Sequence, residues 1–432
     1  MDILDEVAID GDEIVSAKDH SGAESLAIKI RPGKEKNLLR HHPWVFSGAI
    51  DEATIPSKAG IYKVLTSEGR FIAWGAYDSD SHIQLRLLSW DMAKFPDQNW
   101  WADAVRASVL RRRDFFRDKN SDTNTFRIIH GEADMIPGVA ADVYARFIRI
   151  IISARIAFDM RQVIVQTLEN LLHPEMIILN TDVAFCAIEK LHQVTEYYAQ
   201  GKKFIPTTRL EEIKIRENGL YYAIVPGTGQ KSGFYCDQRE NRSRLELYVK
   251  DATVLDGCSY TGGFTLHALR AGAKMVHAID SSADAIHRLL SNVNLNIQLG
   301  TLPTSARDRV KATKADIFET LRTMPRNLYD VIILDPPKLA QTIKSLDNAK
   351  KAYKDLNRMS MEKIRPNGIL LTCSCSGSLT REDFRTVLSW AAKDAAVEAQ
   401  ILETLGQAQD HPIRLSFPES EYLKVFILRI IK

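Results

Sequence analysis

The chain has 432 residues, of which 45% are hydrophobic and 26% charged, a composition typical of globular proteins with roughly two to four domains. Lysine and arginine together number 57 and aspartate and glutamate 55, so the formal net charge is +2. The five cysteines are too few for a disulfide scaffold, and no pair has the Cys-x-x-Cys spacing of a zinc ribbon. We therefore expect no bound metal.

Neither a membrane span nor a secretory signal is predicted. The longest apolar stretch, residues 147–158, is interrupted by Arg149 and Arg155. The N-terminus carries acidic residues instead of a basic region followed by an apolar core. We expect a reduced, cytoplasmic protein with no membrane partner.

The charge is unevenly distributed along the chain. Residues 1–26 hold eight acidic residues and one lysine, a charge of −7, which leaves +9 for residues 27–432. We expect the acidic leader to be disordered. The basic remainder favours a nucleic-acid partner, which the average charge conceals.

The first folded region, expected over 27–105, contains short β-type runs separated by turn residues. The runs at 61–65, 71–74 and 83–88 predict a small β-barrel or sandwich. Its basic residues are Lys29, Arg31, Lys34, Lys36 and Arg40. They precede Trp44 and Phe46, and bases beside aromatic rings suit phosphate contact and stacking in RNA. The alternative is a solvated loop with both rings in the core.

A central α+β region is expected over 106–215. A helix is predicted over 100–117, a strand over 147–153 and a second helix over 159–172. From residue 216 the character changes again, and beyond residue 253 strands and helices alternate. The expected strands are 253–255, 275–279, 310–312, 329–334, 369–372 and 422–431, and the expected helices are 264–270, 283–296, 317–324, 348–364 and 381–392.

This alternation predicts an α/β domain with a doubly wound, mostly parallel sheet. Ligands of such sheets bind beyond the carboxyl ends of the strands. The first strand ends at a turn in which Gly262 and Gly263 open a helix, where backbone N–H groups can hold an anion. The turn lacks the GxGxxG pattern of dinucleotide folds, and Gln230 replaces the second glycine of a P-loop at 227–232.

Two acids follow the next strand ends. Asp280 is placed to accept hydrogen bonds from ribose hydroxyls, and Asp316 is placed near an adenine edge. Each could equally cap the helix that follows it. Three such features at successive strand ends favour S-adenosylmethionine, which has an adenine, a ribose and a zwitterionic tail but no pyrophosphate.

The fourth and fifth strand ends carry the candidate catalytic groups. Asp335 precedes two prolines that hold the backbone extended, and Lys338 follows where enzymes that methylate exocyclic amines usually have an aromatic ring. The fifth end holds Cys373 and Cys375, and a thiolate that adds to carbon 6 of a pyrimidine activates carbon 5. Strand alternation places both cysteines on one side, so spacing does not choose between them. The remaining cysteines, Cys186, Cys236 and Cys258, are interpreted as structural.

From about residue 28 to 432 the chain resembles the family of bacterial ribosomal RNA large-subunit methyltransferase I enzymes, which form 5-methylcytosine in 23S ribosomal RNA. The matching motifs are Gly-Lys-Glu-Lys-Asn-Leu-Leu-Arg-His-His-Pro-Trp-Val-Phe-Ser-Gly at 33–48, Ser-Gly-Phe-Tyr-Cys-Asp-Gln-Arg at 232–239, Ser-Tyr-Thr-Gly-Gly at 259–263, Asp-Pro-Pro-Lys at 335–338 and Ser-Cys-Ser at 374–376. The chain departs from the family at 182–190, where a basic run is absent. It also has Pro337 where two-cysteine cytosine methyltransferases have cysteine.

The resemblance implies three folded parts: a small β-barrel PUA domain over 27–105 that binds RNA, a central α+β linking domain over 106–215, and a Rossmann-like, seven-stranded class I methyltransferase domain over 216–432. It marks Cys375 as the nucleophile, with Cys373 at a position that tolerates other residues and Asp335 beside them. The implied S-adenosylmethionine contacts are Asp237, Ser259, Tyr260, Gly262, Asp280, Ser281, Asp316 and Asp335. The implied RNA contacts are Lys29, Arg31, Lys34, Lys36, Arg40, Trp44 and Lys338.

The sequence thus predicts an S-adenosylmethionine-dependent cytosine-5 methyltransferase of 23S ribosomal RNA. A uracil-5 or guanine-N methyltransferase is one alternative, and an RNA-binding protein with a vestigial cofactor site is another. RNA is the expected partner, and a homodimer remains an open alternative for the assembly.

Overall fold

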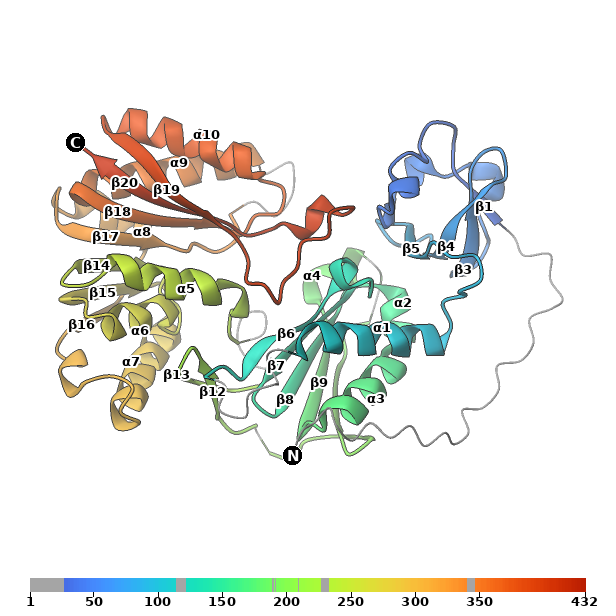
Figure 1. The fold of residues 1–432 in the computed structure, drawn as a ribbon, viewed down its shortest axis with the longest axis horizontal. Helices are drawn as coiled ribbons and strands as arrows, with labels where there is room; N and C mark the ends of the chain where they lie inside the picture. Colours follow the sequence, from blue (N-terminus) through green and yellow to red (C-terminus); the bar gives the residue numbers. More distant parts are fainter. Residues whose placement is uncertain are drawn as a thin grey trace.

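The computed structural model describes residues 27–113, 122–188, 190, 192–208, 210–226, 233–339 and 346–432. The acidic leader, the segment 227–232 and the end of the helix expected over 100–117 lie outside these residues. Figure 1 shows three folded parts in chain order: an N-terminal domain in blue, a central sheet in cyan and green, and a C-terminal domain in yellow to red.

The N-terminal domain is a small β structure, as expected. Its five-stranded sheet has the order β1-β3-β4-β5-β2, with β1 parallel to β3 and the other pairs antiparallel. The strands are β1 (Ala27–Lys29), β2 (Trp44–Val45), β3 (Gly60–Leu65), β4 (Phe71–Tyr77) and β5 (Leu85–Ser89). Its core holds Ile28, Val64 and Leu87 among other aliphatic residues.

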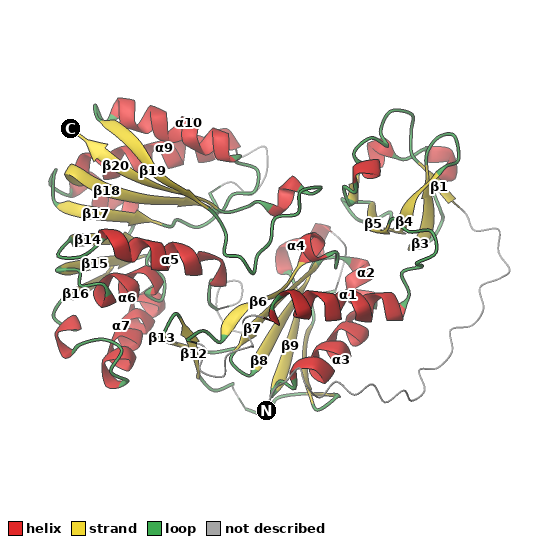
Figure 2. Ribbon diagram, in the orientation of Figure 1, coloured by secondary structure: helices red, strands yellow, loops and turns green. Residues whose placement is uncertain are grey.

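The central domain is a six-stranded sheet with the order β11-β10-β9-β8-β7-β6. The strands are β6 (Thr125–His130), β7 (Val139–Tyr144), β8 (Phe147–Ile152), β9 (Met176–Thr181), β10 (Thr195–Ala199) and β11 (Lys202–Phe204). Helices α1 (Gln98–Arg111) and α3 (Arg161–Leu172) pack side by side against this sheet (Figure 2), while α2 (Arg155–Asp159) and α4 (Val183–Ile188) flank it.

The structure places the domain boundaries differently from the sequence. The expected boundary at 105/106 falls inside α1, and Trp101 and Val105 pack in the core of the central domain. The boundary expected at 215/216 falls inside β12 (Ile213–Glu217), which pairs with β13 (Leu220–Ile224). That hairpin packs on the C-terminal core through Ile215 and Tyr222.

The C-terminal domain contains the doubly wound sheet. Seven strands have the order β16-β15-β14-β17-β18-β20-β19, and all pairs are parallel except those made by β20. The strands are β14 (Thr253–Gly257), β15 (Met275–Asp280), β16 (Val310–Lys314), β17 (Tyr329–Leu334), β18 (Ile364–Ser374), β19 (Glu398–Leu405) and β20 (Lys424–Ile431). Aliphatic runs such as Val331–Leu334 are fully buried because helices cover both faces.

The helices divide between the two faces of this sheet. Helices α5 (Arg239–Leu245), α6 (Gly263–Arg270) and α7 (Ala283–Gln298) contribute to one core, and α8 (Ile317–Thr323), α9 (Leu346–Lys363) and α10 (Arg381–Asp394) to the other. The sequence located all of these strands except β19. That edge strand has the sequence Glu-Ala-Gln-Ile-Leu-Glu-Thr-Leu. Most of these residues favour helices, and its apolar and polar residues do not alternate as they do in a half-buried strand.

The segment between β19 and β20 ties the domains together. The buried carboxylate of Asp410 accepts hydrogen bonds from Arg239 Nη2 at 2.8 Å and from the backbone N–H of Arg127 at 2.7 Å. Its backbone carbonyl accepts one from Arg112 Nη2 at 2.8 Å. Further along, the ring of Phe417 packs against Trp44 of the N-terminal domain with 4.6 Å between centroids. This segment therefore contacts both other domains.

Across the ranges described above, no helix has the length and apolar character needed to cross a membrane. The same residues contain no group of three or more His, Cys, Asp or Glu side chains arranged to hold a metal ion.

We predict that Asp410→Asn lowers the free energy of unfolding by about 3 kcal/mol at pH 7, because it removes the buried carboxylate that pairs with Arg239 and leaves that guanidinium only the half-exposed Glu240. Although burial alone would raise it, His411 and Arg239 hold the pKa of Asp410 well below its usual range. This stabilisation is complete above about pH 4 and is lost as the pH falls further. Urea denaturation followed by circular dichroism measures the loss. Asp394→Asn, which removes an exposed ion pair with Lys354, is the control and should change the midpoint little.

Candidate functional site

The carboxyl ends of β14, β15, β17 and β18 meet at one edge of the C-terminal sheet, next to the point where the strand order reverses at β14. The turn after β14 packs on the end of β15 through a hydrogen bond from Ser259 N to Ile279 O of 2.9 Å. Asp335, which follows β17, donates its backbone N–H to Gly257 O at 3.4 Å. These contacts bring together the ends of β14, β15 and β17, where the general rule for such sheets places the ligand-binding crevice.

The turn from β14 into α6 leaves no room for side chains at its two glycines. Gly262 has φ +92°, and a Cβ atom there would lie 2.8 Å from Leu289 Cγ. A Cβ atom on Gly263 would lie 2.5 Å from Arg242 Nε. Close packing on both sides holds the first backbone N–H groups of α6 toward the crevice.

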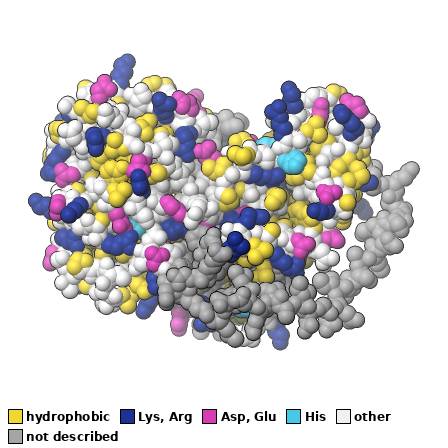
Figure 3. All heavy atoms as spheres, in the orientation of Figure 1, with side chains coloured by type: hydrophobic (Ala, Val, Ile, Leu, Met, Phe, Trp, Pro, Cys, Tyr) yellow, Lys and Arg dark blue, Asp and Glu magenta, His cyan; other side chains and the backbone are white. Residues whose placement is uncertain are grey.

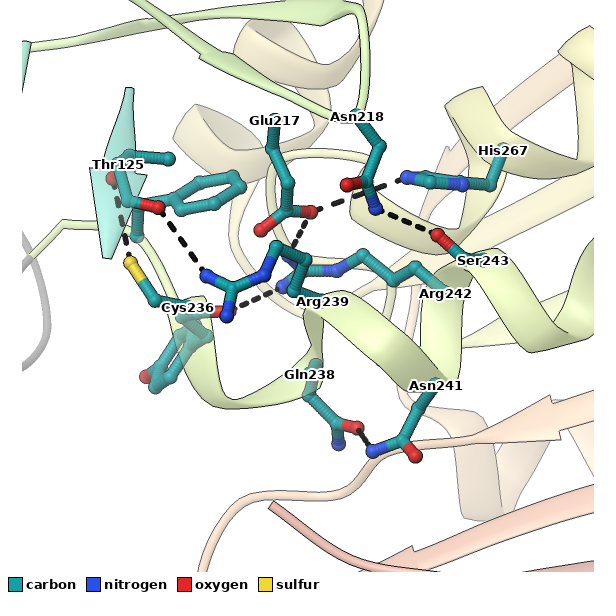
Figure 4. Close-up of polar contacts among 12 residues, drawn as sticks. Thr125, Glu217, Asn218, Cys236, Gln238, Arg239, Asn241, Arg242, Ser243 and His267 are labelled. Carbon is teal, nitrogen blue, oxygen red and sulfur yellow. Dashed lines mark hydrogen bonds and ion pairs between the residues drawn. The ribbon is translucent and has the colours of Figure 1, made fainter. Parts of the chain in front are cut away.

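Arg242 supports this turn from beneath. Its Nη1 forms a buried ion pair of 2.7 Å with Glu217 of the β12–β13 hairpin. Figure 4 shows this pair beside His267 of α6 and the Asn218–Ser243 hydrogen bond of 2.6 Å. The hairpin, α5 and α6 are thus linked by polar contacts under the glycine turn.

Two buried polar atoms in this turn have no hydrogen-bond partner. Asp256 accepts from Thr265 Oγ1 at 2.6 Å through Oδ2, which leaves Oδ1 unpaired, and Ser259 Oγ is also unpaired. Burial raises the pKa of Asp256 to about 6. Buried polar atoms without hydrogen-bond partners, next to the turn at Gly262 and Gly263, can bind the polar tail of S-adenosylmethionine. Asp256 is not among the residues predicted from the sequence, although its place near the end of the first strand is a usable signal.

The acids at the next two strand ends differ in their surroundings. Asp280 accepts backbone hydrogen bonds from Tyr260 N at 2.9 Å and Ser282 N at 2.8 Å, which tie the turn to β15. Asp316 is exposed and caps α8 by accepting from Glu319 N at 3.0 Å. The capping alternative considered for Asp316 is therefore observed. Ser281 is exposed beside Asp280.

The side chain of Asp335 lies next to the amide group of Gln238. Asn241 Nδ2 donates to Gln238 Oε1 at 2.6 Å, which fixes the orientation of the Gln238 amide (Figure 4). The Gln238 amide faces Asp335 and Cys373 and opposes the rise in the pKa of both groups. Burial, reinforced by the neighbouring Asp237 carboxylate, raises the pKa of Asp335 to about 7. Near neutral pH this group is therefore present both as a carboxylic acid and as a carboxylate.

The structure shows that Cys373 and Cys375 differ in burial, a difference that strand alternation alone does not predict. Cys373 lies inside β18, is 0% exposed and belongs to the hydrophobic core. Burial, with the nearby Asp335, raises its pKa well above the usual thiol value. Cys375 lies one residue beyond β18 and is partly exposed. Its thiol is the one that can meet a ligand in the crevice.

Asp237 and Tyr235 cover the crevice from the segment that precedes α5. Tyr422 Oη donates to Asp237 Oδ2 at 2.6 Å. The ring of Tyr235 meets that of Tyr260 edge to face, 5.4 Å between centroids. Burial raises the pKa of Tyr235, and so do Tyr260, Asp335, Asp237 and Cys375. Tyr235 therefore lies near Asp237, Asp335 and Cys375, three of the residues predicted for the site.

The predicted RNA contacts fall into two sets. Lys34, Lys36, Arg40 and Lys338 are exposed. Figure 3 shows lysine and arginine side chains at the upper margin of the N-terminal domain, facing a hollow between it and the C-terminal domain. Lys29 belongs to β1, where it is partly buried and donates its backbone N–H to Thr54 Oγ1 at 2.9 Å.

Arg31 and Trp44 are engaged within the protein. Arg31 Nη2 pairs with Glu52 at 2.7 Å, and its Nε donates to Ile50 O at 2.8 Å. The Trp44 indole N–H donates to Glu132 Oε1 of the central domain at 2.8 Å, while its ring meets that of Phe417 in a T-shaped contact. Trp44 is therefore held between domains, and its stacking on RNA stays a prediction.

Three residues that sequence reasoning missed are placed here by the tertiary structure: Gln238, Tyr422 and Lys424. Gln238 had a signal, since it lies within the motif at 232–239. Tyr422 and Lys424 had none, because β20 returns to the crevice only through sheet pairing.

Comparisons with known proteins agree with this geometry. Residues 28–90 match the family model described as a PUA-like domain, and residues 127–414 match the model of S-adenosylmethionine-dependent methyltransferases. A ribosomal RNA large subunit methyltransferase I from Shewanella frigidimarina is 33% identical over 417 residues, which cover 94% of this chain and 100% of that protein. The protein of the same name from Aeromonas salmonicida is 35% identical over 409 residues, covering 94% and 99%.

Solved structures share the fold over its full length. A methyltransferase from Streptococcus mutans described as SAM-dependent aligns with a TM-score of 0.77 and 19% identity, covering 94% of this chain and 100% of that one. Another methyltransferase structure, in complex with SAH, aligns with a TM-score of 0.78 and 20% identity, covering 94% and 99%. Together with the family models and the full-length relatives, this shows that the chain belongs to the S-adenosylmethionine-dependent methyltransferase family, in the branch that contains the ribosomal RNA large subunit methyltransferase I proteins.

Proposed function

We propose that this protein methylates carbon 5 of a cytosine in the RNA of the large ribosomal subunit, using S-adenosylmethionine. The observation that carries the proposal is that a partly exposed thiol, Cys375, and a carboxyl group with a pKa near neutrality, Asp335, follow the ends of the neighbouring strands β18 and β17. Methyl transfer to an exocyclic amine does not need a nucleophilic thiol.

S-Adenosylmethionine would be held in the crevice at the strand ends and supplies an electrophilic methyl group when bound. The α6 N-terminus, Asp256 and Ser259 offer unpaired polar groups for its amino-acid part. Asp280, with Ser281 beside it, is suited to the ribose hydroxyls, and Asp316 to the adenine edge. Asp237, Tyr260 and Gly262 complete the proposed contacts.

The catalytic sequence begins with the target cytosine turned out of the RNA into the crevice. The Cys375 thiolate adds to carbon 6, which converts the 5,6 double bond to a single bond and raises electron density on carbon 5, the atom that is methylated. Negative charge also develops at ring nitrogen 3 during the addition. The neutral form of Asp335 can donate a hydrogen bond there, and Gln238 orients its carboxyl group. Loss of the carbon 5 proton to a base and departure of the sulfur from carbon 6 then restore the double bond and free the enzyme.

RNA is proposed to bind across the hollow between the PUA-like domain and the methyltransferase domain. Lys34, Lys36 and Arg40 are exposed residues of the PUA-like domain, and the exposed Lys338 follows Asp335 in the methyltransferase domain. A positive charge at Lys338, in place of an aromatic ring, suits a phosphate contact next to the flipped base.

The cofactor site is tested by Gly262→Ala. The new methyl group would lie 2.8 Å from Leu289 Cγ in a backbone with φ +92°, so the turn must shift. We expect binding of S-adenosylmethionine, measured by isothermal titration calorimetry, to weaken by at least about tenfold. Gly300→Ala is the matched control, because Gly300 also has a positive φ but its Cβ would meet nothing within 4 Å. Equal affinities in both variants would contradict the assignment.

The nucleophile is tested by Cys375→Ala against Cys373→Ala. Loss of the Cys375 thiol should abolish methyl transfer to ribosomal RNA, measured with tritiated S-adenosylmethionine, while cofactor affinity stays unchanged. Cys373→Ala removes a buried thiol and should keep activity within about tenfold of the wild type, since its cost is a small cavity. Nucleoside mass spectrometry identifies the product, and 5-methyluridine or a methylated guanosine would refute the cytosine assignment. Full activity of Cys375→Ala would rule out the covalent step.

The role of Asp335 predicts a distinctive pH dependence. Because its pKa is raised to about 7, the hydrogen-bond-donating acid form predominates below pH 7 and is lost as the pH rises above it. We expect kcat/KM to fall on that side with an apparent pKa near 7. Asp335→Asn keeps an N–H donor at all pH values, so it should remove this descending limb. Because the carboxylic acid itself is lost, the rate should also fall by about tenfold or more. An unchanged limb in the Asn variant would show that another group titrates.

A further inference from the structure

Lys424 is a buried cation at the start of β20, opposite the end of β18. It is 1% exposed and pairs in register with Ser374. Its Nζ donates to Ser376 O at 2.7 Å and to Tyr422 O at 2.9 Å. Through the strand pairing and the first of these hydrogen bonds, Lys424 holds the backbone on both sides of Cys375.

The bonds of Lys424 are made to neutral carbonyl groups. The buried guanidinium groups of Arg112, Arg239 and Arg242 each pair with a carboxylate. Within the described part of the chain, no carboxylate lies within ion-pair distance of Lys424, and Glu421 is already paired with Arg381 at 2.6 Å. A buried ammonium group without an anionic partner is costly, which raises the question of what balances its charge.

The nearby thiol is suited to that role. Burial lowers the pKa of Lys424 to about 8, and among the surrounding charges Cys375 opposes this most strongly, ahead of Glu421. Arg381 and Lys338, the other charged groups that face the amine, lower its pKa further. The sulfur of Cys375 in its thiolate form is therefore the strongest anion available to the buried ammonium.

We propose that Lys424 is the positioning residue of the nucleophile: its ammonium group fixes the Cys375 peptide through Ser376 and stabilises the Cys375 thiolate by its charge. The inference deepens the proposed mechanism and rests on it for its catalytic meaning. The Cys375 thiol loses its proton to solvent, and the negative charge of the resulting thiolate passes to the base when sulfur bonds to carbon 6. Lys424 itself contacts no reacting atom.

The test measures the acidity of Cys375 directly, without RNA. The alkylation rate of Cys375 by iodoacetamide is followed from pH 6 to 10 in the full-length protein, with tandem mass spectrometry to distinguish Cys375 from Cys373. We expect Lys424→Met to raise the apparent pKa of the thiol by about one unit or more, which lowers its alkylation rate at pH 7 about tenfold. The kcat/KM for RNA methylation should fall in parallel, with unchanged affinity for S-adenosylmethionine.

Two further variants separate charge from structure. Lys424→Gln keeps a donor for the Ser376 carbonyl but no charge, and should show the same raised pKa. It also serves if Lys424→Met does not fold, as judged by circular dichroism. Lys432→Met is the matched control, because Lys432 likewise donates to backbone carbonyls, those of Glu362 and Ile364, at the opposite end of β18. It should leave the thiol pKa unchanged.

A wild-type thiol pKa in both Lys424→Met and Lys424→Gln would overturn the proposal, and so would an equal shift in Lys432→Met. Failure of the proposed function gives a different result. In that case Cys375→Ala stays active while the pKa shift in the Lys424 variants persists.

Discussion

The carboxylate of Asp410 is the interaction on which the arrangement of the catalytic crevice depends. It binds Arg239 of α5 and the backbone of β6, and its own carbonyl binds Arg112. These contacts anchor the segment between β19 and β20 at the seam between two domains. From the same segment, Ala408 N bonds to Asp237 O at 2.9 Å. Tyr422 and Lys424 then follow at the start of β20. A buried ion pair between two domains thus helps to set the position of groups at the proposed site.

The crevice contains several acidic side chains that burial shields from water. Asp237, Asp256 and Asp335 share it, and burial raises the pKa values of Asp256 and Asp335 to about 6 and about 7. Mutual repulsion adds to this effect, since Asp237 raises the pKa of Asp335. The same surroundings disfavour a thiolate. A nucleophilic cysteine in this position therefore needs a cation such as Lys424 to stabilise its thiolate.

The N-terminal domain is joined to the rest of the protein by aromatic and charged contacts. Trp44 links it to Glu132 and Phe417, and His42 lies 3.2 Å from Glu419 of the segment before β20. Residues that look like an RNA-binding motif in the sequence are thus partly used to orient the domain. Lys34, Lys36 and Arg40 of the same domain are exposed and are the residues proposed to contact RNA. Fixing this domain against the segment that carries Tyr422 gives RNA binding a defined geometry relative to Cys375.

The sequence by itself determined the alternating strands and helices from 253 onward, the acids at their carboxyl ends and the family, because hydrophobic periodicity and turn residues are local signals. It missed β19, a polar edge strand composed of helix-forming residues, and it placed a domain boundary inside α1. Only the tertiary structure shows that Cys373 is buried within β18 whereas Cys375, one residue beyond the strand, is partly exposed, since strand alternation treats the two positions alike. It likewise brought Gln238 and Lys424 to the crevice and turned Trp44 toward Glu132. Burial, pairing across a sheet and contacts between domains join residues far apart in the chain, and no local pattern encodes them.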